Sequence, residues 1–173
     1  MAVPQLHFVA GSFVNFRDHA FQDAGGHAFR WVSLKAFRFP PGAGDRELLG
    51  ALIAHEQFRD DYAGGDVEPD GTRHGPYRLD RISPGAYRPV APADAIRTLR
   101  GWAARYGRVP TSLEAVLEER VHRVIGPGTA CHRLADLGRD AFHDWGGVHC
   151  AFHEYVVVDH AHAALTLLVA ADD

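Results

Sequence analysis

The segment from Phe142 to His162 contains the densest group of residues that can do chemistry. Five of the twelve histidines fall in this window, which is about an eighth of the sequence: His143, His149, His153, His160 and His162. Asp144, Glu154 and Asp159 lie among them. Histidines beside carboxylates act as general acids and bases, and neutral imidazole is a common metal ligand. The sequence therefore directs the search for a site to this segment.

The local structure expected here argues against a metal site. Residues 148–159 are predicted to form a strand, because the run Tyr155–Val158 strongly favours β structure. In a regular strand His149 and His153 share one face, and Glu154 points to the other. Four residues at about 3.3 Å each separate the two histidines by roughly 13 Å, too far for bonds of about 2.1 Å to one ion. We expect no cofactor and no metal ligand, although a single divalent metal, zinc or iron, remains the alternative if other strands supply ligands.

A metal-free site needs only one histidine with a carboxylate or an arginine in a pocket. The candidate catalytic residues are His143, His149, His153 and Glu154. The alternative is that these histidines are amphipathic residues of a sheet. Cys150 is a poor candidate nucleophile, since its neighbour His149 faces away from it on a strand. His160 and His162 fall in a predicted hairpin turn, where we expect them in solvent.

Three residues elsewhere are candidates for binding an anionic substrate. Arg17 and His19 lie at the end of the first predicted strand, where they either form the rim of a pocket or end the strand as polar residues. Arg120 lies within the apolar stripe of its predicted helix. An arginine that faces a core needs an anionic partner, which is either an internal carboxylate or a substrate group.

Other motifs with a known mechanism are incomplete. The run His55–Arg59 begins like the zinc-protease pattern, but Arg59 stands where the second histidine is required. The run Asp66–Gly71 resembles the start of a calcium loop, but Tyr77 occupies the position of the bidentate glutamate. The sequence contains no glycine-rich nucleotide motif, which argues against the usual dinucleotide and NTP chemistry.

Composition limits the class of protein. The chain has 173 residues, which predicts a single domain over residues 1–173, and its net charge of −4 argues against nucleic-acid binding. The N-terminus has no signal-peptide pattern, and no apolar run is long enough for a membrane span. We therefore expect a cytoplasmic protein with two reduced cysteines, no membrane partner and no nucleic-acid partner. A homodimer through an edge strand or through exposed aromatic residues is a further hypothesis.

The charges are segregated along the chain. Residues 56–70 carry six acids and one arginine, and residues 73–108 carry eight arginines and two acids. One interpretation is a basic surface for an anionic substrate or an acidic partner protein. The other is that these are two solvated faces that balance each other.

The elements that must position these residues form an α+β domain. Hairpins open and close the chain, and helices fill the middle, which predicts an antiparallel sheet from N- and C-terminal hairpins with about three helices packed on one face of it. The predicted strands are 6–17, 28–39, 76–82, 148–159 and 164–170, with turns at Asp23–Gly26 and 160–163. The predicted helices are 45–58, 92–106 and 111–125, the last with a capping box at Thr111–Glu114.

Two functions are compatible with these patterns. The first is a small cytosolic enzyme that acts on a small, anionic organic substrate by histidine acid–base chemistry, of the lyase, isomerase, cyclase or hydrolase type. Arg17 or Arg120 would then hold the anionic group. The alternative is a non-enzymatic binding protein, regulatory, accessory or immunity-type, that uses its acidic and arginine-rich surfaces.

Overall fold

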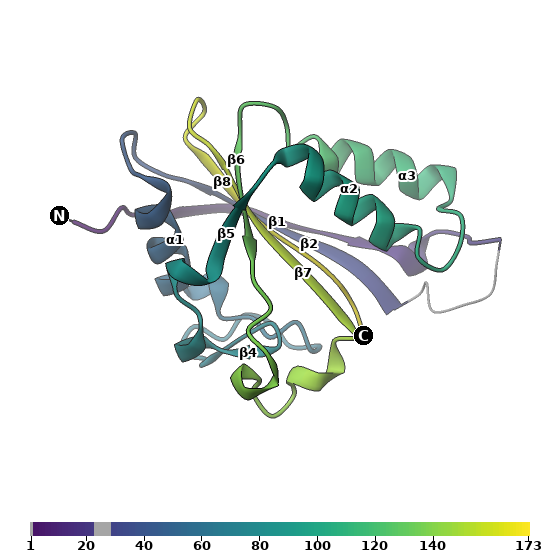
Figure 1. The fold of residues 1–173 in the computed structure, drawn as a ribbon, viewed down its shortest axis with the longest axis horizontal. Coiled ribbons are helices and arrows are strands. Elements are labelled where there is room, and N and C mark those ends of the chain that lie inside the picture. Colours follow the sequence, from purple (N-terminus) through teal and green to yellow (C-terminus); the bar gives the residue numbers. More distant parts are fainter. Residues whose placement is uncertain (1, 23–28) are drawn as a thin grey trace.

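The computed structural model describes residues 2–22 and 29–173, and its centre is a six-stranded antiparallel sheet (Figure 1). The strand order is β1-β2-β8-β7-β6-β5. These strands are β1 (His7–Asn15), β2 (Arg30–Arg38), β5 (Tyr87–Val90), β6 (Ala130–Leu134), β7 (Ala151–Asp159) and β8 (Ala164–Asp172). A separate two-stranded sheet consists of β3 (Arg73–His74) and β4 (Tyr77–Arg78). The helices are α1 (Asp45–Ala54), α2 (Pro92–Ala103) and α3 (Thr111–Leu117).

The predicted α+β class and both terminal hairpins are confirmed. β1 pairs antiparallel with β2, and β7 pairs antiparallel with β8. The two hairpins meet in the middle of the sheet, where β2 pairs with β8 from Arg30↔Asp172 to Arg38↔Ala164. The centre of the sheet is therefore formed by the pairing of the first hairpin with the last. The turn predicted at Asp23–Gly26 falls within residues 23–28, outside the described part.

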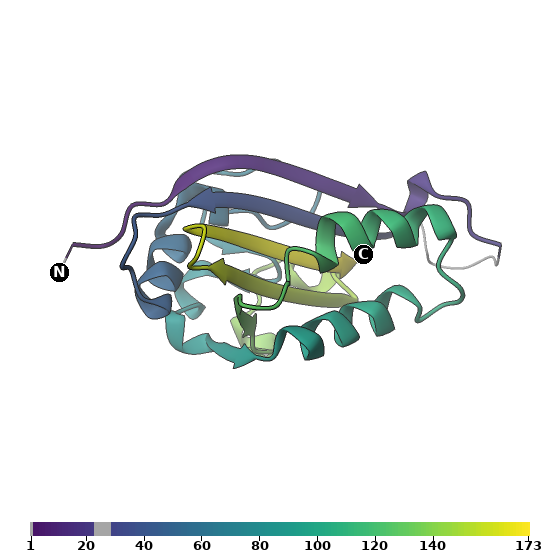
Figure 2. The same ribbon diagram turned by 90° about the horizontal axis from the view of Figure 1, so that it is seen from above.

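Helices cover both faces of the sheet, so the prediction that they pack on one face is wrong. On β2, Trp31 and Phe37 belong to a core that includes α1, whereas Val32 and Leu34 belong to a second core with α2 and α3. Figures 1 and 2 show α2 and α3 side by side, away from α1. The physical reason is visible in β2, β7 and β8, whose apolar residues occupy both faces, as in strands buried on two sides.

The helix predicted from Asp45 is shorter than expected. α1 ends at Ala54, and a 3-10 turn at Glu56–Phe58 follows it. Its N-cap is Gly44, whose N–H donates to the Glu47 carboxylate at 2.9 Å. The capping box expected at Thr111–Glu114 does not form, because Pro110 is the N-cap of α3 and no side chain caps it.

The third helix widens into a π turn over Glu118–His122. The Arg123 N–H donates to the carbonyl of Glu118, five residues back, at 3.1 Å. This extra residue in the turn moves the buried stripe to Val121 and His122 and leaves Arg120 exposed. The expectation that Arg120 faces the core is therefore wrong.

None of the helices in the described part of the chain has the length and apolar run that crossing a membrane requires. Cys131 is buried and Cys150 is exposed, and both are free thiols. Burial raises the pKa of the Cys131 thiol to about 12, so that thiol stays protonated.

The Asp45 carboxylate joins three parts of the fold at the start of α1. It accepts hydrogen bonds from His132 of β6 at 2.8 Å and from His160 of the β7–β8 turn at 2.6 Å. Burial alone raises the pKa of Asp45, but the two histidine hydrogen bonds outweigh burial and hold the pKa below its ordinary value of 3.8. His160 thus has a partner, although it lies in the turn where it was predicted.

We predict that Asp45→Asn lowers the free energy of unfolding and that this loss depends on pH. Because the folded pKa of Asp45 is depressed, its contribution is complete above about 3.8 and disappears as the pH falls through the folded pKa below that value. Urea unfolding at neutral pH and near pH 3 measures the difference between wild type and variant. Asp144→Asn is the control, since Asp144 is exposed and has no recorded partner in the described chain. An effect that is equal at both pH values would contradict the role of the carboxylate.

Candidate functional site

Glu154 lies at the centre of a buried polar network. Its carboxylate accepts from the ring Nε2 of His74 and from the Tyr87 hydroxyl, each at 2.5 Å. The Nδ1 of His74 donates to the Phe58 carbonyl, and the Phe58 ring stacks on the imidazole with centroids 3.5 Å apart. The side chains of His74 and Glu154 are both 0% exposed.

The protonation pattern of this network follows from its partners. Both ring nitrogens of His74 face oxygen atoms, an arrangement that a doubly protonated imidazolium beside the Glu154 carboxylate satisfies. Burial raises the pKa of Tyr87, and the charge of Glu154 raises it further, so its hydroxyl remains a donor. Glu154 is therefore placed as the buried counter-ion of His74, shielded from any substrate in solution.

His74 is held in position by the turn that follows it, where the backbone packs closely against the ring of Phe152. Gly75, in the turn between β3 and β4, has a positive φ of 50°, and a Cβ there would lie 2.3 Å from the ring of Phe152. His143 fixes the same turn, because its Nε2 donates to the Gly75 carbonyl at 2.6 Å and its Nδ1 accepts from the Trp145 N–H at 3.0 Å. The predicted catalytic residue His143 is buried, and both of its nitrogens are engaged.

His149 and His153 lie on opposite faces of the sheet, so the prediction of a shared face is wrong. The reason is that β7 begins at Ala151, after a 3-10 turn at Gly146–Val148, which places His149 outside the strand. The ring of His149 packs against Trp31 on the α1 face, whereas His153 packs against Trp102 on the α2 face.

The two histidines differ in their hydrogen bonding. His149 contacts the Asp61 carbonyl through Nε2 at 2.9 Å and the Asp173 carboxylate through Nδ1 at 3.1 Å. The Nδ1 of His153 is buried without a hydrogen-bond partner in the described chain. Burial lowers the pKa of His153, and the charge of Arg133 lowers it further, so this ring is neutral near pH 7.

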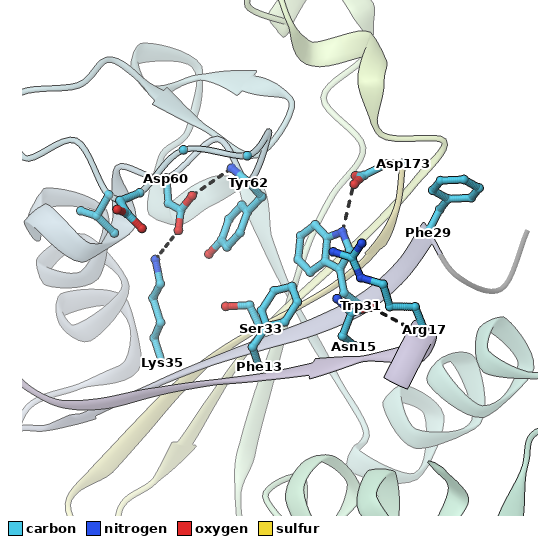
Figure 3. Close-up of a pocket in the computed structure, with 14 residues that line it drawn as sticks. Phe13, Asn15, Arg17, Phe29, Trp31, Ser33, Lys35, Asp60, Tyr62 and Asp173 are labelled. Atoms are coloured by element: carbon cyan, nitrogen blue, oxygen red, sulfur yellow. Dashed lines mark hydrogen bonds and ion pairs between the residues drawn. The ribbon is translucent and has the colours of Figure 1, made fainter. Parts of the chain in front are cut away.

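A groove of about 570 Å³ lies over β2, on the α1 face of the sheet (Figure 3). We call it the β2 groove. Its walls come from β1, from β2 and from the loop that follows α1, together with the last residue of the chain. The lining residues are Phe13, Asn15, Arg17, Phe29, Trp31, Ser33, Lys35, Asp60, Tyr62, Gly64, Gly65, Asp66, Val67 and Asp173.

Three aromatic rings form a row across the β2 groove. Phe13 stacks on Trp31 with centroids 5.4 Å apart, and Trp31 stacks on Tyr62 at the same distance. The indole N–H of Trp31 donates to Asp173 at 3.4 Å. Phe13 and Phe29 remain 50% and 62% exposed, so the groove retains open aromatic surface for a ligand.

Lys35 and Asp60 form a part-buried ion pair at one end of the groove. Lys35, the only lysine in the chain, donates from Nζ to the Asp60 carboxylate and to the Gln57 carbonyl, both at 2.8 Å. An ammonium carries three hydrogens, and these are its two recorded acceptors in the described chain. The third hydrogen has no oxygen acceptor in the described chain, and Nζ also lies 5.1 Å from the centroid of the Tyr62 ring, a cation–π contact.

Asp60 also sets the conformation of Tyr62. Its second carboxylate oxygen accepts the Tyr62 N–H at 2.9 Å, and Tyr62 has a φ of 56°, which is unusual for a bulky residue. Such strain persists where the surrounding structure enforces it, often at functional sites. The Tyr62 hydroxyl is buried and points toward Ser33 (Figure 3). Burial and the charge of Asp60 raise its pKa well above 10.0, so it is a hydrogen-bond donor at neutral pH.

Arg17 is the one predicted substrate-binding residue that lines the groove. Its side chain reaches from the end of β1 toward Trp31 (Figure 3), and its guanidinium has no recorded acceptor in the described chain. His19 instead contacts the Ser112 hydroxyl at 2.9 Å, and Arg120 is exposed on the π turn. Arg17, His19 and Arg120 therefore do not form one site.

The segregated charges partly neutralise one another. Arg73 lies 3.6 Å from Asp61, which links the basic and acidic segments. On α2, Arg97 pairs with Asp94 within the helix, and Arg100 pairs with Glu118 at 2.9 Å. This pairing supports the interpretation of two balanced faces more than that of one uniform basic surface.

Sequence reasoning missed most of the residues that line the β2 groove. The alternation of Trp31, Ser33 and Lys35 on one face of a strand was readable, and a solitary lysine on a largely apolar face was the available signal. His74 and Tyr87 gave no such signal, because their partner Glu154 lies about 70 to 80 residues away.

No group of three or more histidine, cysteine or acidic residues in the described ranges is arranged to hold a metal ion. Comparisons with protein-family models, with curated proteins and with solved structures found no match.

We predict that Glu154→Ala lowers the free energy of unfolding by about 3 kcal/mol or more, since it leaves the His74 imidazolium buried without a counter-ion. Tyr87→Phe removes one hydrogen bond from the same carboxylate and should cost about 1 to 2 kcal/mol. Chemical denaturation of the three proteins measures both values. Equal losses in the two variants would show that Glu154 is not the ion that the network depends on.

Proposed function

We propose that the protein binds a small planar organic molecule with an anionic group, and that the β2 groove is its binding site. One observation carries this proposal: a row of aromatic rings lies between Lys35 and Arg17, two cationic side chains that both retain unused hydrogen-bond donors. Ligand sites commonly combine aromatic walls with a few fixed polar groups in this way.

The unused donors support an anionic or carbonyl-bearing ligand. Lys35 retains one N–H, and the Arg17 guanidinium retains its planar fork, which suits a carboxylate. The two lie at opposite ends of the groove in Figure 3. Two of the three acidic side chains of the lining, Asp60 and Asp173, are already occupied by Lys35 and by Trp31 with His149, whereas Asp66 is the third.

The aromatic row supports a flat ligand. Phe13 and Phe29 present exposed ring surface at the open side of the groove, and Tyr62 forms the opposite wall. A planar molecule can stack on these rings at little conformational cost. Aromatic carboxylates combine both features and are the ligand class that the lining fits best.

We predict that aromatic carboxylates bind wild-type protein and that Arg17→Met weakens their binding about tenfold, or about 1.4 kcal/mol. The probes are benzoate, 4-hydroxybenzoate and 2-naphthoate, measured by saturation-transfer NMR and by tryptophan emission. Lys35→Met should have a similar effect if the carboxylate lies at its end of the groove.

Arg46→Met is the matched control, because Arg46 is exposed on α1 and does not line the groove. Binding that survives both groove substitutions, or that Arg46→Met weakens equally, would contradict the proposed site. Absence of binding for all three probes and for other planar anions would contradict the ligand class.

The second candidate is an enzyme acting on such a ligand, and Lys35 with Tyr62 favours it. Both side chains line the groove and are proton donors, and together they can hydrogen-bond a ketone oxygen once a ligand draws the buried Tyr62 hydroxyl away from Ser33. An α-proton would then move to a lining carboxylate such as Asp66 as the enolate forms, which is isomerase or lyase chemistry. A histidine in this role has less support, since both nitrogens of His149 are engaged.

We predict that the protein accelerates exchange of the α-protons of phenylpyruvate in D₂O if this second function holds. Proton NMR follows the exchange. Tyr62→Phe should reduce the enhancement at least tenfold, while Arg46→Met should not. An exchange rate equal to that of buffer alone would exclude this chemistry for phenylpyruvate. It would not bear on the binding function, which the aromatic carboxylates test.

A further inference from the structure

The two edges of the six-stranded sheet are built differently. β5 has only four residues, and one of them is Pro89, which has no N–H to offer another strand. β1 has nine residues, HFVAGSFVN, with no acidic residue, lysine, arginine or proline. Natural edge strands usually carry such residues because they prevent pairing with other chains. β1 is therefore an open edge, and β5 is a protected one.

Exposed apolar side chains concentrate beside β1. The described ranges contain eight exposed large apolar residues, and half of them lie between residues 3 and 13: Val3, Phe8, Val9 and Phe13. Their exposed fractions run from 40% to 71%. Exposed apolar side chains gathered along an open sheet edge favour interaction with another chain.

A β-bulge divides the strand into two parts. The register with β2 shifts between Phe8 and Ala10 and then runs without interruption from Ala10 to Asn15. Bulges twist an edge away from new partners, so Val9 limits pairing toward the N-terminal end. The free edge suited to pairing is therefore residues 10–15, with Phe8 and Val9 beside it.

We propose that β1 pairs antiparallel with β1 of a second copy of this chain, which joins the two sheets into one. A strand that pairs antiparallel with its own copy does so about a twofold axis, and a twofold interface uses the same patch on both chains. No charge lies in β1 to oppose its own copy. Because the other edge is short and carries Pro89, assembly ends at two chains.

The pairing also places the two β2 grooves on one face of the joined sheet. Phe13 and Asn15 belong to β1 and line the groove, so the partner strand would lie directly beside that wall. The dimer does not depend on a ligand, and its test is independent of the binding measurements.

The size of the contact sets the expected affinity. Six residues of strand extend about 20 Å, and such a strip is smaller than the roughly 800 Å² per partner of stable interfaces. We therefore expect a dissociation constant on the order of 10 µM.

Sedimentation velocity of the full chain over about 1 to 300 µM tests the proposal. We expect a shift from a species of 19.0 kDa to one of twice that mass. Ser12→Asp, in the middle of the pairing segment, should weaken dimerisation at least tenfold, because like charges then face each other across the twofold axis. Ser83→Asp is the control, an exposed serine remote from β1 in sequence.

Val9→Lys is a second variant that tests the same interface even if Ser12→Asp does not fold. Circular dichroism of both variants checks their folds. Backbone amides of residues 10–15 should also exchange more slowly as protein concentration rises. A monomer at every concentration overturns the proposal, and so does a dimer that Ser12→Asp and Val9→Lys leave unchanged. Larger open assemblies would overturn the closed pair.

Discussion

The structure depends on one buried charge, the carboxylate of Glu154 on the central strand β7. A carboxylate without water needs donors for both oxygens, and a cation to balance it. The fold supplies the Tyr87 hydroxyl from β5 and the His74 imidazole from the β3–β4 hairpin. β5 is the edge strand of the sheet and the β3–β4 hairpin is a separate element, so satisfying this one group fixes how both lie relative to β7. Removal of either donor leaves the other parts packed around an unsatisfied ion.

The hydrogen-bond network of Glu154 is connected to the β2 groove through a short series of contacts. His74 stacks on Phe58 and bonds to its carbonyl, and Asp60 follows two residues later. Asp60 holds Lys35 with one oxygen and the Tyr62 N–H with the other. The wall of the groove is thus anchored to a network that a ligand never touches. Rigid support of this kind is what keeps Tyr62 in its costly backbone conformation.

Local patterns were sufficient to predict the hairpins and the α+β class, because alternation, turns and β-branched runs act over a few residues. Tertiary contacts decided the rest. The predicted strand from 148 begins only at Ala151, and that small shift moved His149 to the opposite face from His153. The helix wheel placed Arg120 in the core because it assumed 3.6 residues per turn throughout, and the π turn breaks that assumption.

The candidate site was less predictable than the fold. Histidine density drew attention to the C-terminal segment, where the structure uses His143 and His149 to tie loops together. The groove combines residues from β1, β2 and the loop after α1, which are far apart in sequence, and only Arg17 among them had been singled out. Nothing within a single segment of this chain encodes such a combination.

The π turn at Glu118–His122 determines where this helix can lose one residue and keep its packing. A π turn holds one residue more than the α-helical turn that would span the same rise. Deletion of a single exposed residue, such as Glu119, would restore regular winding and still leave Val121, His122 and Ile125 on the buried side. The turn is therefore the place where the helix accommodates one extra residue without changing what it presents to the core.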